Sequence, residues 1–593
     1  MMPSLRHAAA ALALAAITIT GCSSDNGPTD PGALAPTGVS ATAAGATVVR
    51  ITFTGLVGDQ GYAVQRATGA TGEDWTTVRT VTAPSGSTQV TFEDRGLQPA
   101  TVYRYRVAAT RGGSTSSWSS AVTVTTGAPG SAGVVNITQD IIANRTLYAD
   151  TTYQLSGFIH VANGATLTIQ PGTVIQGDYN TVGSSLFIMR GAKINAVGTA
   201  QLPIVFTSSR PAGQRQPGDW GGLVIIGNGV INRTGDIEIE GTGTVTGTTS
   251  GSNYKVLYSG GTSNDDDSGS LKYVRVEFAG FAPSLNNELN SFTFGAVGSR
   301  TKVSHLQALA GLDDSFEFFG GAVDADHLVS YETGDDHFDM SEGYSGRLQY
   351  LIAFQSTVLT QRAGAGQPSS DPEGIENDGC AGTGCTNGFN TTPYTQPVVA
   401  NFTLIGTGDA ATSGSSGGLG MMLRRGTGGW YVNGVVARWP RGGVSLRDAE
   451  TWARAGGVAT PDLASADLAL RNILFVQVPS VFQAGGTSVQ NTFDLAGNGL
   501  VNDATATSAS LFTAFPATAG AGTATAAFDW TPAAGSPAAS GGLATFTGKL
   551  PAKVATPLAS GNGTIGGTTF LGAAPTSGSD VRWWAGWTRY AQN

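Results

Sequence analysis

Charge and sulfur are both scarce in this sequence of 593 residues. Asp, Glu, Lys and Arg together make up 12% of it, and there are 5 histidines and 3 cysteines. The formal net charge of −10 argues against a nucleic acid as partner, because binding phosphates requires a basic surface. After Thr20 no segment is long and apolar enough for a transmembrane helix. No Gly-x-y period runs through the 85 glycines, which excludes collagen.

The abundant residues favour strands. Glycine, threonine, serine and valine are frequent, helix formers are few, and 40% of the residues are hydrophobic. This composition predicts an all-β chain of many short strands joined by turns, and it argues against general disorder. The length exceeds that of a single ordinary domain, so we expect more than one.

The first residues form a targeting signal. The apolar stretch 8–20 is too short to cross a bilayer but is typical of a signal peptide. It ends in Ile19-Thr-Gly-Cys22, which resembles a bacterial lipobox. The resemblance implies a lipoprotein signal peptide over 1–21 and lipidation of Cys22, so that the membrane becomes a partner through the lipid anchor. An ordinary secretory signal with an incidental cysteine is the alternative.

The residues after the lipobox indicate to which membrane the protein is anchored. Residues 22–36 are polar and contain Pro and Gly, so we expect a tether. Ser23 stands where lipoproteins retained at an inner membrane commonly carry aspartate, which favours the outer membrane and the cell surface. Export also makes a disulfide plausible between Cys380 and Cys385, which lie in a Gly-rich loop.

Residues 37–127 predict a β-sandwich. Alternating strands are expected over 49–53, 62–66, 89–92, 102–107 and 122–124. The segment Leu97-Gln-Pro-Ala-Thr-Val-Tyr-Arg-Tyr-Arg-Val closely resembles a fibronectin type III signature, with Tyr103 as its corner tyrosine. Phe53 departs from the family, because many members carry tryptophan there. The resemblance implies a spacer or a scaffold near glycan.

A repeat organises the later part of the chain. His305, Asp313-Asp314 and Phe316 recur 22 residues later as His327, Asp335-Asp336 and Phe338, and Gln349 continues that register. A period of 22–23 residues made of short strands is one turn of a parallel β-helix, whereas propeller blades need about 40 residues. The register predicts two internal stacks and an asparagine ladder: Phe292, Phe316 and Phe338; Phe294, Phe318 and Met340; and Asn401, Asn433 and Asn472.

We therefore expect a parallel β-helix domain over 135–593. The region resembles a group of large exported bacterial β-helix proteins, which implies a right-handed solenoid but little about activity. The aromatic end, Trp583-Trp-Ala-Gly-Trp-Thr-Arg-Tyr, is predicted to form a C-terminal cap on the last coil.

The best candidate site is an acidic ladder on two successive coils. Neighbouring strands lie about 4.8 Å apart, so stacked carboxylates repel one another unless a cation, a raised pKa, a nearby arginine or solvent offsets the repulsion. Calcium suits such a ladder, since it takes carboxylate oxygens in flexible geometry. The alternative is an exposed acidic edge with solvent and Arg347 nearby. The candidate metal ligands are Asp313, Asp314, Glu317, Asp335, Asp336 and Asp339, and Glu376 and Asp378 are expected to extend the surface.

Catalysis and direct ligand binding are further possibilities for this region. Enzymes on this fold use aspartates as acid and base, or calcium with a basic residue, and Asp313, Asp335 and Asp339 are the catalytic candidates. Arg347 and Arg362 are the basic residues expected near the ladder. Arg424, Arg425 and Arg447 stand out in a chain poor in charge and are candidates for binding an acidic glycan, although pairing with the nearby Asp448 and Glu450 is the alternative.

Three functions follow from these features. The first is a cell-surface lipoprotein whose β-helix binds or scaffolds an extracellular ligand, a glycan being the favoured class. The second is a polysaccharide lyase or glycoside hydrolase that uses the acidic ladder. The third is a structural surface-layer or adhesive protein. The absence of a specific catalytic motif favours the first over the second, and the sequence leaves the oligomeric state open.

Overall fold

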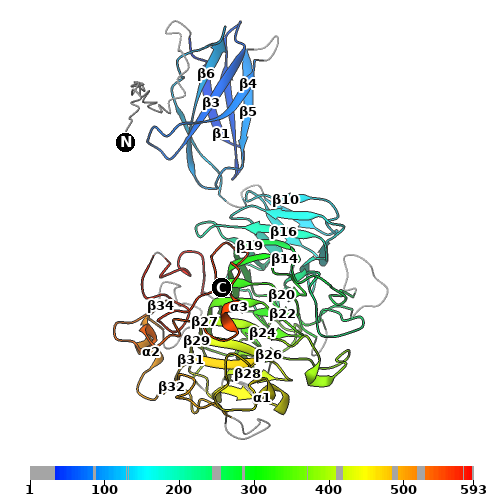
Figure 1. Ribbon diagram of the computed structural model, residues 1–593. Helices are drawn as coiled ribbons and strands as arrows, with labels where there is room; N and C mark the ends of the chain where they lie inside the picture. Colours follow the sequence, from blue (N-terminus) through cyan, green and yellow to red (C-terminus); the bar gives the residue numbers. More distant parts are fainter. Residues whose placement is uncertain are drawn as a thin grey trace, which may run out of the picture. The chain divides into compact units, whose positions relative to one another are not determined.

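The computed structural model describes residues 34–83, 88–128, 130, 133–243, 255–283, 287–369, 372–408, 418–483, 492–516, 528–578 and 580–590. The predicted signal peptide 1–21, Cys22 and most of the tether lie outside these residues. The chain divides into two compact units, of which the second comprises Gly45–Thr47, Gln98–Ala100 and Gly127–Asn593 (Figure 1). Among the described residues, no helix has the length and apolar character that a membrane span requires.

The first unit is an antiparallel β-sandwich. One sheet has the order β1-β2-β5, and the other has the order β4-β3-β6 with β7 and β8 paired to β6. Tyr103, Tyr105 and Val107 alternate inward on β6, and Phe53 packs edge-on against Tyr62 with ring centroids 4.9 Å apart. Phenylalanine thus occupies the core position where the family often has tryptophan. The strands are β1 (Thr37–Ala43), β2 (Val48–Thr54), β3 (Gly61–Thr68), β4 (Thr76–Thr82), β5 (Gln89–Arg95), β6 (Val102–Arg111), β7 (Ser114–Thr115) and β8 (Val122–Thr125).

The second unit is a parallel β-helix. Its larger sheet, called sheet I, has the order β32-β31-β29-β27-β25-β23-β21-β19-β17-β14-β11-β9, with β10, β13 and β16 beside it. The strands of sheet I are β9 (Val134–Ile137), β10 (Arg145–Leu147), β11 (Thr152–Leu155), β13 (Thr166–Ile169), β14 (Val174–Gly177), β16 (Lys193–Val197), β17 (Ile204–Ser208), β19 (Gly269–Glu277), β21 (Lys302–Leu309), β23 (Ala325–Tyr331), β25 (Arg347–Phe354), β27 (Val398–Ile405), β29 (Gly429–Ala437), β31 (Leu468–Val476) and β32 (Leu500–Asp503).

The facing sheet, called sheet II, has the order β12-β15-β18-β20-β22-β24-β26-β28-β30, and all of its pairs are parallel. Its strands are β12 (Phe158–Val161), β15 (Ser185–Ile188), β18 (Leu223–Ile226), β20 (Phe292–Gly295), β22 (Phe316–Phe319), β24 (Phe338–Ser341), β26 (Glu373–Asp378), β28 (Leu419–Arg424) and β30 (Gly442–Leu446). From β19 to β31 the chain alternates between the two sheets, and each coil contributes one strand to each.

The predicted internal stacks are confirmed. Phe316 pairs with Phe292 and with Phe338 on neighbouring strands, and the ring centroids lie 5.0 and 5.4 Å apart. The expected register of Gln349 is wrong by one residue: Gln349 pairs with Asp326 rather than His327. The coil that contains β24 is one residue longer than its predecessor, so Tyr350 falls opposite His327.

A ladder of left-handed residues bends the strands of sheet I. Each sheet I strand from β19 to β31 contains one non-glycine residue with a φ between +51° and +60°, a region where asparagine is enriched among non-glycine residues. The predicted asparagine ladder forms the later half of this column, and His305 and His327 stack in the earlier half with ring centroids 4.4 Å apart. The column is Tyr273, His305, His327, Tyr350, Asn401, Asn433 and Asn472.

The aromatic C-terminal segment lies along the side of the β-helix, and the prediction that it caps the last coil is wrong. Arg275 on β19 donates to the Trp587 carbonyl at 2.8 Å, and Tyr590 donates to Glu332, beside β23, at 2.5 Å. The buried rings of this segment cover the outer face of sheet I, where apolar side chains point outward.

Short elements complete the second unit. The helices are α1 (Ala449–Arg454), α2 (Ser508–Leu511) and α3 (Leu550–Lys553), and the 3-10 turns are η1 (Gly388–Asn390) and η4 (Pro537–Ala539). The strands β33 (Phe512–Ala514) and β34 (Asp529–Pro532) form an antiparallel pair.

Candidate functional site

One column of outward-facing residues on sheet II changes from apolar to acidic. On the early coils it carries Phe187 and Val224, which the loop after β18 covers with its own apolar side chains. On the later coils the same column carries Glu317, Asp339 and Glu376, in register on β22, β24 and β26. Alternation along a strand places these carboxyl groups outside while Phe316 and its equivalents point into the core.

A second row of acidic residues runs along the start of the same strands. Asp314 Oδ1 accepts the backbone N–H of Asp336 at 2.8 Å, and Asp336 Oδ1 accepts that of Glu373 at 2.5 Å. Asn290 begins the row by accepting the N–H of Asp314 at 3.2 Å. These bonds tie each side chain to the next coil, so the row is rigid and the side chains cannot move apart.

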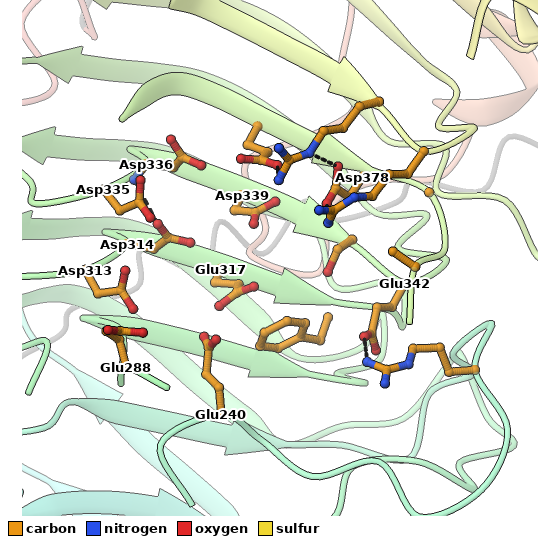
Figure 2. A pocket seen from close by; sticks show the side chains of 18 residues that line it. Glu240, Glu288, Asp313, Asp314, Glu317, Asp335, Asp336, Asp339, Glu342 and Asp378 are labelled. Carbon is orange, nitrogen blue, oxygen red and sulfur yellow. Dashed lines mark hydrogen bonds and ion pairs between the residues drawn. The ribbon is translucent and has the colours of Figure 1, made fainter. Parts of the chain in front are cut away.

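The two rows line a cavity of about 310 Å³ on the outer face of sheet II (Figure 2). Figure 2 shows the acidic side chains spread along successive strands, with Glu240 and Glu288 at one end and Asp378 near the other. Among the described residues that line the cavity, the only basic ones are Arg233, Arg424 and Arg425. The acidic lining residues are Glu240, Glu288, Asp313, Asp314, Glu317, Asp335, Asp336, Asp339, Glu342, Glu376 and Asp378.

The structure brings together most of the residues that the sequence singled out. All six candidate metal ligands line the cavity, as do Glu376, Asp378, Arg424 and Arg425, whereas Arg447 does not. The expectation that Arg347 and Arg362 lie beside the ladder is wrong. Arg347, on sheet I, is ion-paired with Asp324, and the guanidinium of Arg362 lies over the Tyr179 ring at 3.9 Å.

The arginines of the cavity pair with its carboxylates. Arg424 forms ion pairs with Glu376 and, at 2.8 Å, with Asp378, which also pairs with Arg425. These two arginines therefore pair with carboxylates, but the expected partners Asp448 and Glu450 are wrong, because the partners are Glu376 and Asp378 on β26. At the opposite edge, Arg233 and Tyr258 both hydrogen-bond to Glu342 at 2.5 Å.

Sequence reasoning missed Glu240, Glu288 and Arg233 as members of this site. Arg233 and Glu240 lie in the long loop between β18 and β19, outside the repeat, so no register connected them with the ladder. Glu342 follows β24 in a left-handed conformation with φ +58°, which turns the chain toward Arg233. The sequence did offer one indication of these residues: the loop contains many charged residues, although the chain as a whole has few.

The expectation of an exposed acidic edge is wrong, because the carboxyl groups are largely buried. Asp314, Glu317 and Asp336 are 6%, 4% and 3% exposed. Burial, reinforced by neighbouring carboxylates, raises the pKa of each well above its ordinary range. Asp313 and Asp339 have pKa values raised in the same way. Burial and Asp378 raise the pKa of Glu376 to about 7, against the opposing effect of Arg424.

The carboxyl groups gather in overlapping triads. Oxygens of three residues lie within 4.8 Å of one another in each of three sets: Asp313, Asp314 and Asp335; Asp314, Glu317 and Asp339; and Asp335, Asp336 and Glu373. Beside the second triad, Asp339 Oδ1 and Ser341 Oγ are buried without a hydrogen-bond partner in the described part of the chain. Carboxylate and hydroxyl oxygens at this spacing are ligands that calcium accepts.

The loop at one edge of the cavity is closed by the predicted disulfide. Cys380 and Cys385 are bonded, and Gly379 and Ala381 line the cavity. Arg233 donates to the Thr383 carbonyl at 2.8 Å, so the closed loop also positions the arginine that pairs with Glu342. The disulfide thus supports the wall of the cavity and takes no part in the carboxylate rows.

The second unit is thus a parallel β-helix with acidic residues stacked on one outer face. Residues 138–534 match the family described as the pectate-lyase like beta helix domain, so the chain, more than half of which is matched, belongs to that family. Residues 34–125 match the fibronectin type III domain. Together the two domains fit a polysaccharide-related or surface protein.

Three solved structures are each similar to a small part of the chain. A Fn3-like protein from Clostridium thermocellum is 27% identical over 15% of this chain and 90% of its own, with a TM-score of 0.14. The FN5 domain of Drosophila Lar is 23% identical over 16% and 94%, with a TM-score of 0.13. The chicken CNTN1 FN1-FN3 domains are 18% identical over 17% of this chain, which spans 33% of theirs, with a TM-score of 0.14. No curated protein matches the chain.

Proposed function

We propose that this protein is a lipid-anchored envelope protein whose β-helix binds an acidic extracellular polysaccharide through calcium in the sheet II cavity. The observation that carries the proposal is the set of carboxylate triads whose oxygens lie within 4.8 Å of one another on a rigid ladder. Like charges at such distances are unfavourable unless protons or cations neutralise them. Calcium bound there would supply that neutralisation and would leave coordination positions for carboxylates of a glycan.

The lining supports cation-mediated binding over direct binding by arginine. Arg424 and Arg425 are ion-paired with Asp378, and Arg233 is ion-paired with Glu342, so an anionic ligand would have to displace these partners. The residues that line the cavity are mostly acidic, and only a few are arginines. The membrane anchor, the cell surface and the outer membrane in this proposal rest on the lipobox ending at Cys22.

Calorimetric titration of the full chain in detergent with calcium and with magnesium tests the proposal. Calcium is expected to bind and to raise the melting temperature, and Asp314→Asn and Asp339→Asn are expected to weaken its binding at least tenfold. Asp265→Asn, in an acidic turn outside the cavity, is the matched control. Polygalacturonate or alginate should bind only in the presence of calcium. No heat of calcium binding would overturn the proposal.

Glycoside hydrolysis is the second candidate function, and one observation favours it. Asp339 and Glu376 are paired on adjacent strands, and their raised pKa values keep a proton available near neutral pH, as a general acid requires. Incubation with neutral and acidic polysaccharides, scored for new reducing ends, separates the two functions. Product that disappears in Asp339→Asn, or in the other catalytic candidates Asp313→Asn and Asp335→Asn, would establish the hydrolase.

A further inference from the structure

A second cavity lies beside the acidic one and has a different character. Its volume is about 370 Å³, within the range of small-molecule sites. It opens where the chain passes from sheet I to sheet II, between the residues that follow β23 and β25 and those that precede β26. Asp335 lines both cavities, so the two are neighbours along the same coil.

One wall of this second cavity is apolar. Val358, Leu359 and Pro368 line it, together with Trp439, whose ring lies edge-on to the imidazole of His337 with centroids 6.2 Å apart. Trp439 donates its indole N–H to the Leu404 carbonyl at 3.1 Å, so its orientation is fixed. Such a surface packs against the C–H face of a ring without providing a charge.

The remaining lining of this cavity includes a histidine and two carboxyl groups. His337 is 1% exposed and lines the cavity; its Nδ1 lies 2.5 Å from Ser330 Oγ, and its Nε2 has no hydrogen-bond partner among the described residues. Asp335 and the fully buried Glu373 supply carboxyl oxygens. The described residues of the lining include neither Lys nor Arg, so none of them compensates an anionic ligand.

We propose that this second cavity binds an uncharged sugar ring, adjacent to the acidic sugar that the calcium-bearing cavity binds. The inference deepens the proposed function and rests on it for the acidic part of the ligand. The apolar wall takes the C–H face of the ring, and hydroxyl groups donate to Asp335 and Glu373 and pair with His337 Nε2. The carboxyl groups repel a uronic acid or a sulfated sugar. The preferred glycan is therefore one in which neutral and acidic sugars adjoin.

Saturation-transfer NMR on the full chain tests this assignment, with methyl glycosides of glucose, galactose, mannose and rhamnose and with glucuronate and galacturonate as probes. At least one neutral glycoside is expected to receive saturation and the uronates much less. Val358→Trp, at a side chain 48% exposed, should block the cavity and weaken binding at least tenfold without disturbing the core. Its matched control is Val182→Trp, at a side chain 54% exposed outside the cavity.

Two further variants separate this inference from the proposed function. His337→Phe should abolish neutral glycoside binding and leave calcium binding unchanged, with His160→Phe, another buried histidine, as its control. Glu317→Gln, in the first cavity alone, should weaken calcium binding and leave the neutral glycoside bound. Saturation that reaches no neutral glycoside, or that persists in both Val358→Trp and His337→Phe, would overturn the inference. Loss of calcium binding alone would overturn only the proposed function.

Discussion

The outer faces of sheet I and sheet II differ in how their buried charged side chains are paired. On sheet I, Asp326 accepts from His327, Ser304 and Asn562, and Arg347 pairs with Asp324, so each charge has a counterpart from the chain itself. On sheet II, Glu317 and Asp339 face each other across adjacent strands, and only Glu376, further along the same column, has an arginine partner, Arg424. The C-terminal segment covers the first face, and a cavity opens on the second.

The two faces also differ in the side chains that make up their clusters of possible metal ligands. His305, Asp326 and His327 also bring three ligating atoms within 4.8 Å of one another, yet Asp580 of the C-terminal segment hydrogen-bonds to His327 at 3.2 Å and completes that cluster. The sheet II triads, in contrast, consist of carboxyl groups alone. The cost of buried like charges there is unexplained by folding, which is why we assign the function to that face.

The largest expected effect on stability comes from removing a buried side chain of the C-terminal segment that covers sheet I. Trp587 is fully buried and contacts Tyr273 and His305 at 5.6 and 5.9 Å between ring centroids. Trp587→Ala should lower the free energy of unfolding by about 3–5 kcal/mol, as expected for a buried tryptophan. Urea denaturation measures the change, with Tyr148→Ala, at a side chain 45% exposed, as the control. A loss below about 1 kcal/mol would mean that the C-terminal segment is not part of the folded core.

A matched pair of neutralising substitutions should act with opposite sign on the two faces. Without divalent cations at pH 7.5, Asp326→Asn removes the partner of His327 and should cost about 3 kcal/mol, as for one half of a buried ion pair. Glu317→Gln removes one of several mutually repelling carboxyl groups and should stabilise the fold by about 1 kcal/mol. Thermal unfolding of both variants checks the signs. Equal destabilisation by Asp326→Asn and Glu317→Gln would contradict the difference that we infer between the two faces.

The sequence predicted the residues of these two faces only where it is periodic. The repeat from His305 to Phe338 contains an unbroken 22-residue register, so it predicted which side chains share a column and placed the six acidic candidates together. A one-residue extension before Tyr350 has no local signature, because it is absorbed in a turn, and it shifted the expected partner of His327.

Contacts made outside the repeat could not be predicted. Arg233 and Glu240 reach the cavity from an irregular loop, and the C-terminal segment reaches β19 from more than 300 residues away in sequence, as the 312-residue separation of Arg275 and Trp587 shows. Burial of the carboxyl groups likewise depends on that loop and on the disulfide-closed turn at Cys380. Sequence alone therefore predicted which residues share the acidic site but not how deeply they are buried.

The pH dependence of stability should differ with calcium. The pKa values of Asp314, Glu317 and Asp339 are raised on folding, so the folded state binds more protons than the unfolded state. Their contribution is full below their ordinary pKa values and is lost as pH rises through the raised ones. Without divalent cations, the melting temperature should therefore fall as the pH rises above the ordinary pKa values of Asp and Glu, about 4. Saturating calcium should abolish most of that fall.

His327 supplies a contribution of the same sign that calcium should not affect. Burial opposes its charge, but hydrogen bonds with Asp326 and Asp580 outweigh burial and raise its pKa. Its stabilisation is also lost as pH rises through that raised pKa. The residual pH dependence in saturating calcium should accordingly disappear in His327→Gln. A melting curve independent of calcium at every pH would contradict the assignment of the sheet II carboxyl groups.

The smallest expected effect on calcium binding concerns the disulfide at the edge of the cavity. Replacing Cys380 and Cys385 by serine should destabilise the loop by about 2 kcal/mol, because the bond closes a short segment. Arg233 and Glu342 would lose their fixed geometry, whereas Glu317 and Asp339 stay in register on their strands. Calcium affinity, measured by calorimetry, should therefore fall less than tenfold, and reduction of the unchanged protein should reproduce that fall. Complete loss of calcium binding would instead place the ion at the disulfide edge and not between the carboxylate rows, and the contrast between the two sheets would then rest on the loop alone.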